Sequence, residues 1–289
     1  MEQGTLTGDL LKAVSRSFYL TIKWLPKEMQ PGVAVGYLLA RATDSVADTA
    51  EAPLPRRTEA LQMMQTAIAG EMPPGLMPML REVVKPAAAS EAELLARFDE
   101  ALSALHALPA QQQGLVRSVL SVIIQGQLWD LSFFEEHTQV LSDEQTRWYI
   151  YRVAGCVGRF WTHLGLCTMG ALFCVPEQAE LMQEAGVRYG CGLQLVNILR
   201  DQDEDAARGR RYLCTEPRVW ADRAERYLRD GLDYSRRLKS YRLRLASMLP
   251  ALLGLKTLAA LRRAKPGTRV KIPRRAVYAS LLRALLAAR

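Results

Sequence analysis

Two pairs of aspartates, each with a spacing of four residues, have the residue types and spacing best suited to chemistry in this chain. Asp44 and Asp48 lie near the N-terminus, and Asp201 and Asp205 lie in the second half of the chain. Residues four apart share one face of a helix, so each pair places two carboxylates side by side. Where such a pair is partly buried, a cation is needed between the charges. Oxygen ligands favour Mg2+, which uses one or two carboxylates and completes its shell with water and phosphate oxygens.

The second pair continues upstream as a polar stripe. Gln194, Asn197, Asp201 and Asp205 follow one another at steps of three, four and four. At about 100° per residue, these side chains occupy a sector about 80° wide on a helix. Apolar neighbours favour a largely buried helix whose stripe faces a cavity, whereas a stripe that faces solvent is the plain alternative. These neighbours are Leu193, Leu195, Val196, Ile198 and Leu199.

The first pair has a similar stripe, in which Tyr37 and Arg41 precede Asp44 and Asp48. Arg41 could form a local ion pair with Asp44, worth a few tenths of a kcal/mol on a surface. A guanidinium also matches the geometry of a phosphate group, so the sharper interpretation is a phosphate-binding arginine. Two further candidates for this role are Arg16 and Arg200.

Helices must position both stripes. Helical periodicity recurs nearly everywhere in the chain, and strand alternation almost nowhere. The apolar fraction of 49% with only 7% aromatic residues also suits packed helices. Ser142 to Gln145 has the pattern of a capping box at a helix start. We predict an all-α protein with helices at residues 6–23, 31–51, 55–69, 75–85, 90–107, 110–137, 142–172, 176–207, 216–247, 249–263 and 273–288.

The domain organisation follows from the scatter of Pro and Gly residues. No stretch of the chain reads as a linker, and no repeat or low-complexity tract divides it. We therefore expect a single domain that covers residues 1–289. Long helices with inward-pointing acids favour a single bundle whose centre is a cavity.

The net charge of +8 indicates attraction to an anionic partner, which can be nucleic acid, a lipid surface or a phosphorylated substrate. A solvated basic surface with no special partner is the bland alternative. The excess charge in the C-terminal third suggests a peripheral contact with an anionic membrane. The basic residues there include Arg236, Arg237, Lys239, Arg242, Arg244, Arg262, Arg263 and Lys265.

The cysteines and the apolar stretches bear on the compartment. Five cysteines form no C-x-x-C pair, and their odd number indicates thiols in a reducing compartment rather than a disulfide framework. The start of the chain lacks the basic and apolar regions of a signal peptide. The most apolar stretches, at residues 160–175 and 248–261, are too short to span a bilayer. We expect a soluble, cytoplasmic protein with any membrane contact at its periphery.

Four ordered blocks of this sequence resemble the squalene and phytoene synthase family. They are Ser15 to Phe18 (SRSF), Tyr37 to Asp48, Tyr149 to Gly158 (YIYRVAGCVG) and Asn197 to Asp205. The resemblance runs from about residue 14 to residue 280. It implies an isoprenoid synthase fold, in which two aspartate-rich motifs on opposite walls of a cavity hold Mg2+ and a prenyl diphosphate such as farnesyl diphosphate.

The resemblance also implies roles for single residues. Asp44, Asp48, Asp201 and Asp205 would bind the metal and act in catalysis. Tyr149 would lie near the reacting carbons, where a phenol can assist proton removal or stabilise a cation. The implied substrate-binding residues are Arg16, Ser17, Phe18, Tyr37, Arg41, Gln194, Asn197, Arg200 and Tyr212.

The C-terminal part is most similar to squalene synthases. Residues 252–258 and the following Val270-Lys-Ile272 match a region whose V-K-I-R segment is associated with NADPH. Two departures stand out: Ala47 occupies the place of a glutamate in the first motif, and Pro273 occupies the place of the arginine. The first bears on one metal ligand, and the second bears on the reductive half reaction. The implied nucleotide contacts are Arg16, Arg41, Arg200, Lys271 and Arg274.

The expected reaction is the Mg2+-dependent head-to-head condensation of two farnesyl diphosphates to presqualene diphosphate and on to squalene with NADPH. Ionising an allylic diphosphate separates charge, which Mg2+ and arginines stabilise. An apolar cavity with aromatic faces shields the carbocation from water. The alternatives within the family are a phytoene or dehydrosqualene synthase, or an enzyme that stops at presqualene diphosphate or hydroxysqualene.

Other classes of protein fit less well. No zinc-binding spacing joins the three histidines to the cysteines, and the chain has no G-x-S-x-G motif, P-loop or G-x-G-x-x-G fingerprint. A basic helical module for nucleic acid or membranes gives the acidic stripes no role, so we expect no nucleic-acid partner. A family member that acts as a partner subunit without turnover is the remaining alternative. The sequence indicates no particular oligomeric state.

Overall fold

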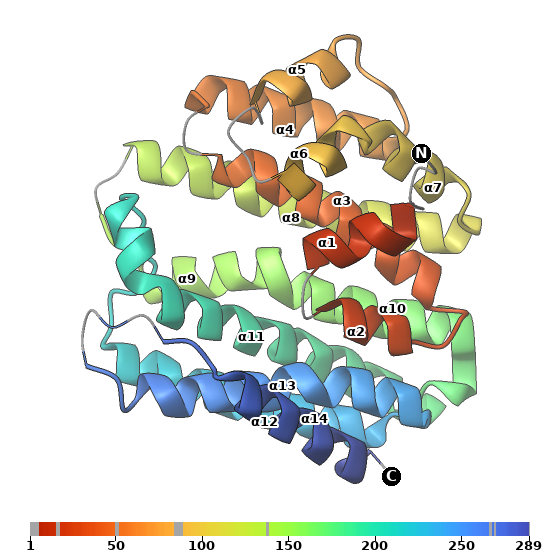
Figure 1. The fold of residues 1–289 in the computed structure, drawn as a ribbon, viewed down its shortest axis with the longest axis vertical. Coiled ribbons are helices and arrows are strands. Elements are labelled where there is room, and N and C mark those ends of the chain that lie inside the picture. Colours follow the sequence, from red (N-terminus) through yellow and green to blue (C-terminus); the bar gives the residue numbers. More distant parts are fainter. Residues whose placement is uncertain are drawn as a thin grey trace. The chain divides into compact units, whose positions relative to one another are not determined.

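The computed structural model describes residues 6–15, 18–49, 52–83, 89–136, 139–265, 268 and 270–288 (Figure 1). Every regular element in these ranges is a helix, which confirms the all-α prediction. The chain divides into two compact units. Unit 1 comprises Met1–Lys23 and Lys27–Phe133, and unit 2 comprises Trp24–Pro26 and Phe134–Arg289. The two units are described separately below.

The third α-helix, α3 (Gln30–Asp48), is the central helix of unit 1 and packs against α4, α6 and α7. Its apolar side chains Leu38, Leu39 and Val46 are completely buried. Their burial sets the rotation of α3 about its axis, and with it the direction in which the polar stripe points. The remaining helices that begin in unit 1 are the π-helix η1 (Leu6–Leu10), α1 (Leu11–Ser15), α2 (Phe18–Trp24), α4 (Leu54–Ala69), α5 (Leu76–Val83), α6 (Ala89–Ala96), α7 (Phe98–His106) and α8 (Ala110–Glu136).

The longest helix of unit 2, α11 (Ala179–Ala207), packs against its neighbours on several sides. In Figure 1 the blue helices α12, α13 and α14 lie beside one another, in agreement with their contacts. The remaining helices of unit 2 are α9 (Asp143–Ile150), the π-helix η2 (Tyr151–Gly155), α10 (Cys156–Met169), the 3-10 helices η3 (Gly170–Leu172) and η4 (Pro176–Gln178), α12 (Pro217–Arg237), α13 (Tyr241–Leu261) and α14 (Arg274–Ala287).

Glycines allow the α9–α10 segment to approach α11 at backbone distance. A Cβ atom on Gly158 would lie 1.9 Å from the carbonyl oxygen of Gly186. A Cβ on Gly190 would lie 2.2 Å from the carbonyl oxygen of Ala154. No side chain fits at these distances, so the glycines of the YIYRVAGCVG block fix the spacing between this segment and the helix that carries the second aspartate pair.

The helix boundaries confirm some sequence predictions and correct others. Ser142 and Gln145 form the predicted capping box, in which the backbone N–H of Gln145 donates to the Ser142 hydroxyl at 3.2 Å. The predicted helix 216–247 instead ends at Arg237, because Leu238 is extended with a ψ of 134°. A new helix begins at Tyr241 and continues through Pro250, where we had predicted a helix start. Packing of apolar residues on both sides of Pro250 outweighs its poor helix propensity.

Helix α13 also corrects the expectation about membrane-spanning length. With 21 residues and a mean hydropathy of 1.3 in its most apolar window, α13 is long and apolar enough to cross a bilayer, the one such helix in the described part of the chain. In the structure, 61% of that window is buried against other helices. The core helix of a bundle has the same length, composition and burial.

Candidate functional site

Asp44 and Asp48 lie one turn apart near the C-terminal end of α3. Asp44 is half-buried and Asp48 is exposed. The side-chain amide of Gln127, on α8, donates a hydrogen bond of 2.6 Å to Asp44 Oδ1. The other amide atom, Gln127 Oε1, is buried without a hydrogen-bond partner in the described part of the chain. Unit 1 therefore holds an oriented carboxylate beside an unsatisfied oxygen.

The ionisation of Asp44 is strongly perturbed. Burial raises the pKa of Asp44 to about 7, and the negative charge of Asp48 adds to the rise. Arg41 and the hydrogen bond from Gln127 act in the opposite direction but do not cancel it. A carboxylate that resists ionisation for these reasons is relieved by a nearby cation. The residues fit Mg2+, which takes oxygen ligands and needs only one or two carboxylates from the protein.

Arg41 contacts a different acid from the one expected. Its guanidinium forms an ion pair with Glu91 on α6 and none with Asp44. The Arg41 Nε is buried and has no hydrogen-bond partner among the described residues. The local Arg41–Asp44 ion pair is therefore wrong, and one donor of the guanidinium is directed at no protein acceptor in the described part of unit 1.

Phe18 and Tyr37 lie together in unit 1. Their rings stack with centroids 5.2 Å apart, and the Tyr37 hydroxyl donates to the carbonyl oxygen of Val14 at 3.3 Å. Tyr37 lies on α3, the helix of the first aspartate pair, and these contacts hold Phe18 of α2 against it. Two other residues predicted to bind substrate, Arg16 and Ser17, lie outside the described residues.

The second stripe lies on the accessible side of α11. Gln194, Asp201 and Asp205 are half-buried and Asn197 is exposed. The Asn197 amide donates to Gln194 Oε1 at 3.4 Å, which links the upstream half of the stripe. Arg200 binds Asp201 with both sides of its guanidinium, through Nε at 2.7 Å and through a second, shorter bond. The charge of Asp201 is thus already balanced within its own helix.

Tyr149 and Tyr212 are brought together by the fold of unit 2. Their rings stack at 5.0 Å, and Phe134 meets Tyr212 edge-on at 5.3 Å. The Thr146 hydroxyl donates to the backbone carbonyl of Tyr212 at 2.5 Å, which ties the chain after α11 to α9. Tyr149 on α9 and Tyr212, which lies 63 residues later in the chain, therefore belong to one aromatic cluster.

Two cavities border α11. The smaller, about 250 Å³, is lined by Asp205, Tyr212 and the backbone after α11. The larger, about 770 Å³, lies between α11, α12 and the end of α13, and its lining includes Leu199, Ala221 and Leu261. None of the predicted site residues lines the larger cavity. Of these two cavities, the smaller is the one at which predicted site residues, Asp205 and Tyr212, meet.

Gln127 is a residue that the sequence analysis missed. It lies with Asp130 on α8, and both side chains are buried. A signal was present in the sequence, because both residues lie in a largely apolar stretch between residues 119 and 131, although Ser121 and Gln125 are polar there too. Buried polar residues on a long helix need partners, and for Gln127 that partner is Asp44.

Lys271 and Arg274 lie at the end of the chain that precedes and begins α14. Both side chains are exposed. Neither side chain forms a hydrogen bond or ion pair with the α11 stripe within the described residues. Their predicted contact with NADPH stays a prediction. Likewise, no group of three His, Cys, Asp or Glu side chains suitable for a metal occurs in the described ranges, so a metal here would depend on paired carboxylates together with water or substrate oxygens.

The architecture and the two aspartate pairs define an all-α isoprenoid synthase. The sequence matches the squalene/phytoene synthase family over residues 11–217. The chain therefore belongs to the squalene/phytoene synthase family, which is a family of prenyltransferases.

The curated relatives include several activities. Presqualene diphosphate synthase of Rhodopseudomonas palustris is 29% identical over 204 residues, which cover 71% of this chain and 60% of the relative. The Zymomonas mobilis presqualene diphosphate synthase is 30% identical over 210 residues, covering 71% and 58%. Squalene synthase ERG9 of Candida albicans is 27% identical over 226 residues, covering 75% and 46%. The chain thus spans less than two thirds of the length of these relatives.

Solved structures confirm the fold. A complex of TcSQS with the ligand E5700 has a TM-score of 0.75 at 22% identity, covering 97% of this chain and 86% of that one. Squalene synthase HpnC from Alicyclobacillus acidocaldarius has a TM-score of 0.58 at 19% identity, covering 88% and 90%. At these identities the comparison establishes the isoprenoid synthase fold predicted from the sequence.

Proposed function

We propose that the protein condenses two farnesyl diphosphates head to head to presqualene diphosphate in a Mg2+-dependent reaction, and carries this product on to squalene with NADPH. The observation that carries the proposal is Asp44, a half-buried carboxylate held by Gln127 beside Asp48, with a pKa raised to about 7. A protein gains nothing in stability from such a group, so a ligand that supplies positive charge explains it best.

Each part of the site has a role in this reaction. Bound Mg2+ would supply positive charge for the leaving diphosphate. Asp44 and Asp48 in unit 1, and Asp201 and Asp205 in unit 2, would hold the cations. The first step breaks the C1–O bond of one farnesyl diphosphate, whose electron pair leaves with the diphosphate. Coupling to the second molecule forms a cyclopropane and releases one proton.

The aromatic cluster of unit 2 suits the cationic stage. The stacked rings of Tyr149 and Tyr212 offer π-faces to a carbocation. Tyr149 is nearly completely buried, so its phenol acts where water has little access. A phenol oxygen in that position can accept the proton released on ring closure, or orient the diphosphate oxygen that accepts it.

An enzyme that stops at presqualene diphosphate is the second candidate. Two relatives carry that name and match 71% of the chain each, against 75% for squalene synthase ERG9. Pro273 stands where squalene synthases have the arginine of the V-K-I-R segment, and its neighbours Lys271 and Arg274, two of the candidates for nucleotide binding, are exposed. A phytoene or dehydrosqualene synthase has the same first chemistry and differs in substrate or in the absence of reduction.

Product analysis separates these candidates. The purified protein is incubated with farnesyl diphosphate and Mg2+, with and without NADPH, and the products are identified by mass spectrometry. Squalene that forms only with NADPH supports both half reactions. Presqualene diphosphate, hydroxysqualene or dehydrosqualene formed regardless of NADPH supports the second candidate. The absence of any condensed product from farnesyl or geranylgeranyl diphosphate refutes the proposed function.

The NADPH contact has its own test. If Lys271 binds a phosphate of the nucleotide, Lys271→Ala raises the KM for NADPH by about tenfold, the loss of one charged hydrogen bond of roughly 1.5 kcal/mol. The KM for farnesyl diphosphate should stay as it is. Equal changes in both constants contradict a nucleotide role for Lys271, and Lys265→Ala serves as the matched exposed control.

A further inference from the structure

Helix α14 exposes an apolar row on its outer side. Tyr278, Leu282 and Leu286 are 69%, 58% and 61% exposed, and they follow one another at steps of four residues. Such steps place the three side chains along one side of the helix. Single exposed apolar residues are ordinary, but three large ones in one row expose a continuous apolar surface.

The opposite side of α14 fixes the helix to α13. Ser280, Ala284 and Ala288, offset from the exposed row by two residues, are buried. Ala284 and Ala288 pack into a cluster with Leu245, Met248 and Leu252. The small side chains allow α14 to lie close to α13, and the apolar row is directed away from it.

Two basic side chains of α13 hold the ends of α14. Arg244 donates to the carbonyl oxygen of Ala288 at 2.7 Å, and Lys256 donates to the carbonyl oxygen of Ala276 at 3.0 Å. The cation at the C-terminal end also complements the helix dipole. The exposed row therefore belongs to a docked helix.

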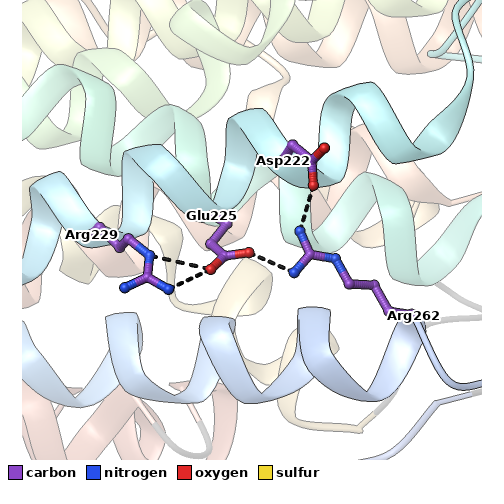
Figure 2. Close-up of polar contacts among 4 residues, drawn as sticks. All are labelled: Asp222, Glu225, Arg229 and Arg262. Atoms are coloured by element: carbon purple, nitrogen blue, oxygen red, sulfur yellow. Dashed lines mark hydrogen bonds and ion pairs between the residues drawn. The ribbon is translucent and has the colours of Figure 1, made fainter.

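Arginines surround the apolar row. Arg274, Arg275 and Arg283 are exposed on the same helix, and no ion pair engages them in the described part of the chain. Arg262, at the end of α13, differs: it is bound by Asp222 at 2.6 Å and by Glu225 at 2.5 Å (Figure 2). The arginines of α14 thus differ from Arg262, whose charge is used in ion pairs between α12 and α13.

Basic and acidic residues are unevenly distributed along the chain. Residues 234–289 contain fifteen lysines and arginines and no acid. The first 233 residues contain 23 basic and 30 acidic residues, so they are net negative. The entire positive excess therefore belongs to the segment that contains α13 and α14.

We propose that the outer face of α14, formed by Arg274, Arg275, Tyr278, Leu282, Arg283 and Leu286, docks on an anionic lipid surface. Leucines and a tyrosine on a basic helix enter the boundary between head groups and acyl chains, while the arginines meet lipid phosphates. An acid-free segment is complementary to a negative surface. The buried α13 stays in the core, so the contact is peripheral.

Flotation with lipid vesicles tests the proposal on the full chain. We expect the protein to float with vesicles of phosphatidylcholine and phosphatidylglycerol, to float much less with phosphatidylcholine alone, and to be partly released by high salt. The triple variant Tyr278→Ser, Leu282→Gln, Leu286→Gln should lose at least tenfold in partition. The triple variant Arg274→Gln, Arg275→Gln, Arg283→Gln should lose about fivefold per arginine, equivalent to about 1 kcal/mol each.

Matched control variants distinguish binding by this face from nonspecific adsorption to vesicles. Met72→Gln with Val157→Gln removes exposed apolar side chains elsewhere, and Arg81→Gln with Arg147→Gln and Arg226→Gln removes the same number of exposed arginines. These controls should bind vesicles like the unchanged protein. Circular dichroism and thermal melting verify that every variant is folded.

Several results would overturn the proposal. Absence of flotation with anionic vesicles rejects a lipid partner. Equal binding by the α14 variants and the controls rejects this face. If the apolar variant changes a dimer to a monomer without a change in flotation, the row is an interface between copies. If heparin or RNA binding depends on the three arginines and flotation does not, the partner is a nucleic acid.

Discussion

The two aspartate pairs have the same spacing and different electrostatics. On α3, Asp44 is half-buried, accepts a hydrogen bond from a neutral amide and has a pKa raised to about 7. On α11, Asp201 is bound on both sides by the guanidinium of the adjacent Arg200. Asp201 thus has a cation in direct contact, whereas the charge of Arg41 only partly offsets the burial of Asp44. The first pair therefore depends on an added cation more strongly than the second does.

This difference separates two ways of presenting carboxylates to a metal and a diphosphate. On α3, burial keeps the Asp44 carboxyl partly protonated near neutral pH, so a cation that binds there would displace a proton. The α11 pair has its own cation, the guanidinium of Arg200. When a metal or diphosphate binds, Arg200 must release Asp201 or share it with the metal. We expect removal of a carboxylate from either pair to reduce activity similarly, and only the change at Asp44 to raise the stability of the metal-free protein.

The largest effect is expected from loss of a carboxylate in either pair. Asp44→Asn and Asp201→Asn should each reduce kcat by at least about a hundred- to a thousandfold, because each removes a group that holds charge in the transition state. Turnover is measured by product formation from farnesyl diphosphate with saturating Mg2+. Near-normal activity of either variant would refute the assignment of that pair, and removal of metal by EDTA should abolish the activity of the unchanged protein reversibly.

The same two variants should differ in thermal stability. Asp44 takes up a proton in the folded state over a pH range, from about 4 to about 7, in which the unfolded state is already ionised. The folded state therefore loses stability as the pH rises through that range. In EDTA at pH 7.5, Asp44→Asn should have a higher Tm than the unchanged protein, and the gap should shrink at pH 5. Asp201→Asn leaves Arg200 without its partner and should show no such gain.

The second prediction concerns the amide that holds Asp44. Gln127→Leu removes the hydrogen bond and leaves the shape of the side chain nearly unchanged, so the orientation of the carboxylate is lost. Loss of an outer hydrogen bond of this kind weakens metal binding by about ten- to a hundredfold. The measurement is the Mg2+ concentration that gives half-maximal activity. Gln125→Leu, an exposed residue on the same helix, should leave that concentration as it was.

The contrast between the pairs also marks what the sequence could predict. Helix periodicity placed Asp44 with Asp48 and Asp201 with Asp205, because residues four apart share a face in any helix. The pattern could not reveal that Arg41 selects Glu91, since Glu91 is fifty residues away and lies on another helix. Gln127 escaped for the same reason: its importance comes from a contact across 83 positions.

Helix boundaries could be predicted from the sequence only where neighbouring residues determine them. The capping box at Ser142 was predictable because its two hydrogen bonds lie within four residues. The helix boundary near residue 238 was not, since the chain there makes a long-range contact, the hydrogen bond from the Lys239 backbone amide to the Phe173 carbonyl at 2.9 Å. The expectation that both pairs face one cavity stays a prediction, as it concerns the arrangement of the two units.

The third prediction tests the glycine contact that positions the α11 pair. In Gly158→Ala the added methyl would lie 1.9 Å from the Gly186 carbonyl, so α10 and α11 must move apart. Overpacking of this kind costs about 1–3 kcal/mol. Thermal or urea unfolding measures the loss, and activity should fall with it. Gly114→Ala on α8 meets nothing within 4 Å and should be neutral or slightly stabilising. Equal behaviour of the two variants would contradict a close backbone approach.

The smallest effect is expected at Glu225, an acid whose pKa is shifted in the direction opposite to that of Asp44. Hydrogen bonds from Arg229, and then from Arg262, lower the pKa of Glu225 (Figure 2). The stabilisation is therefore complete above about pH 4.5 and disappears as the pH falls through the lowered pKa. Because the network is solvated, Glu225→Gln should cost only about 0.2–1 kcal/mol at pH 7.

Chemical unfolding of Glu225→Gln at several pH values measures this loss. The difference from the unchanged protein should shrink toward zero below pH 4, the reverse of the trend for Asp44→Asn, whose advantage grows as the pH rises. Glu184→Gln is the matched control, because Glu184 has a single longer contact of 3.7 Å with Arg188. A Glu225→Gln loss that is independent of pH would mean that Glu225 acts through packing between α12 and α13. The contrast in sign between an acid that needs a cation and an acid that already has two would then fail at this position.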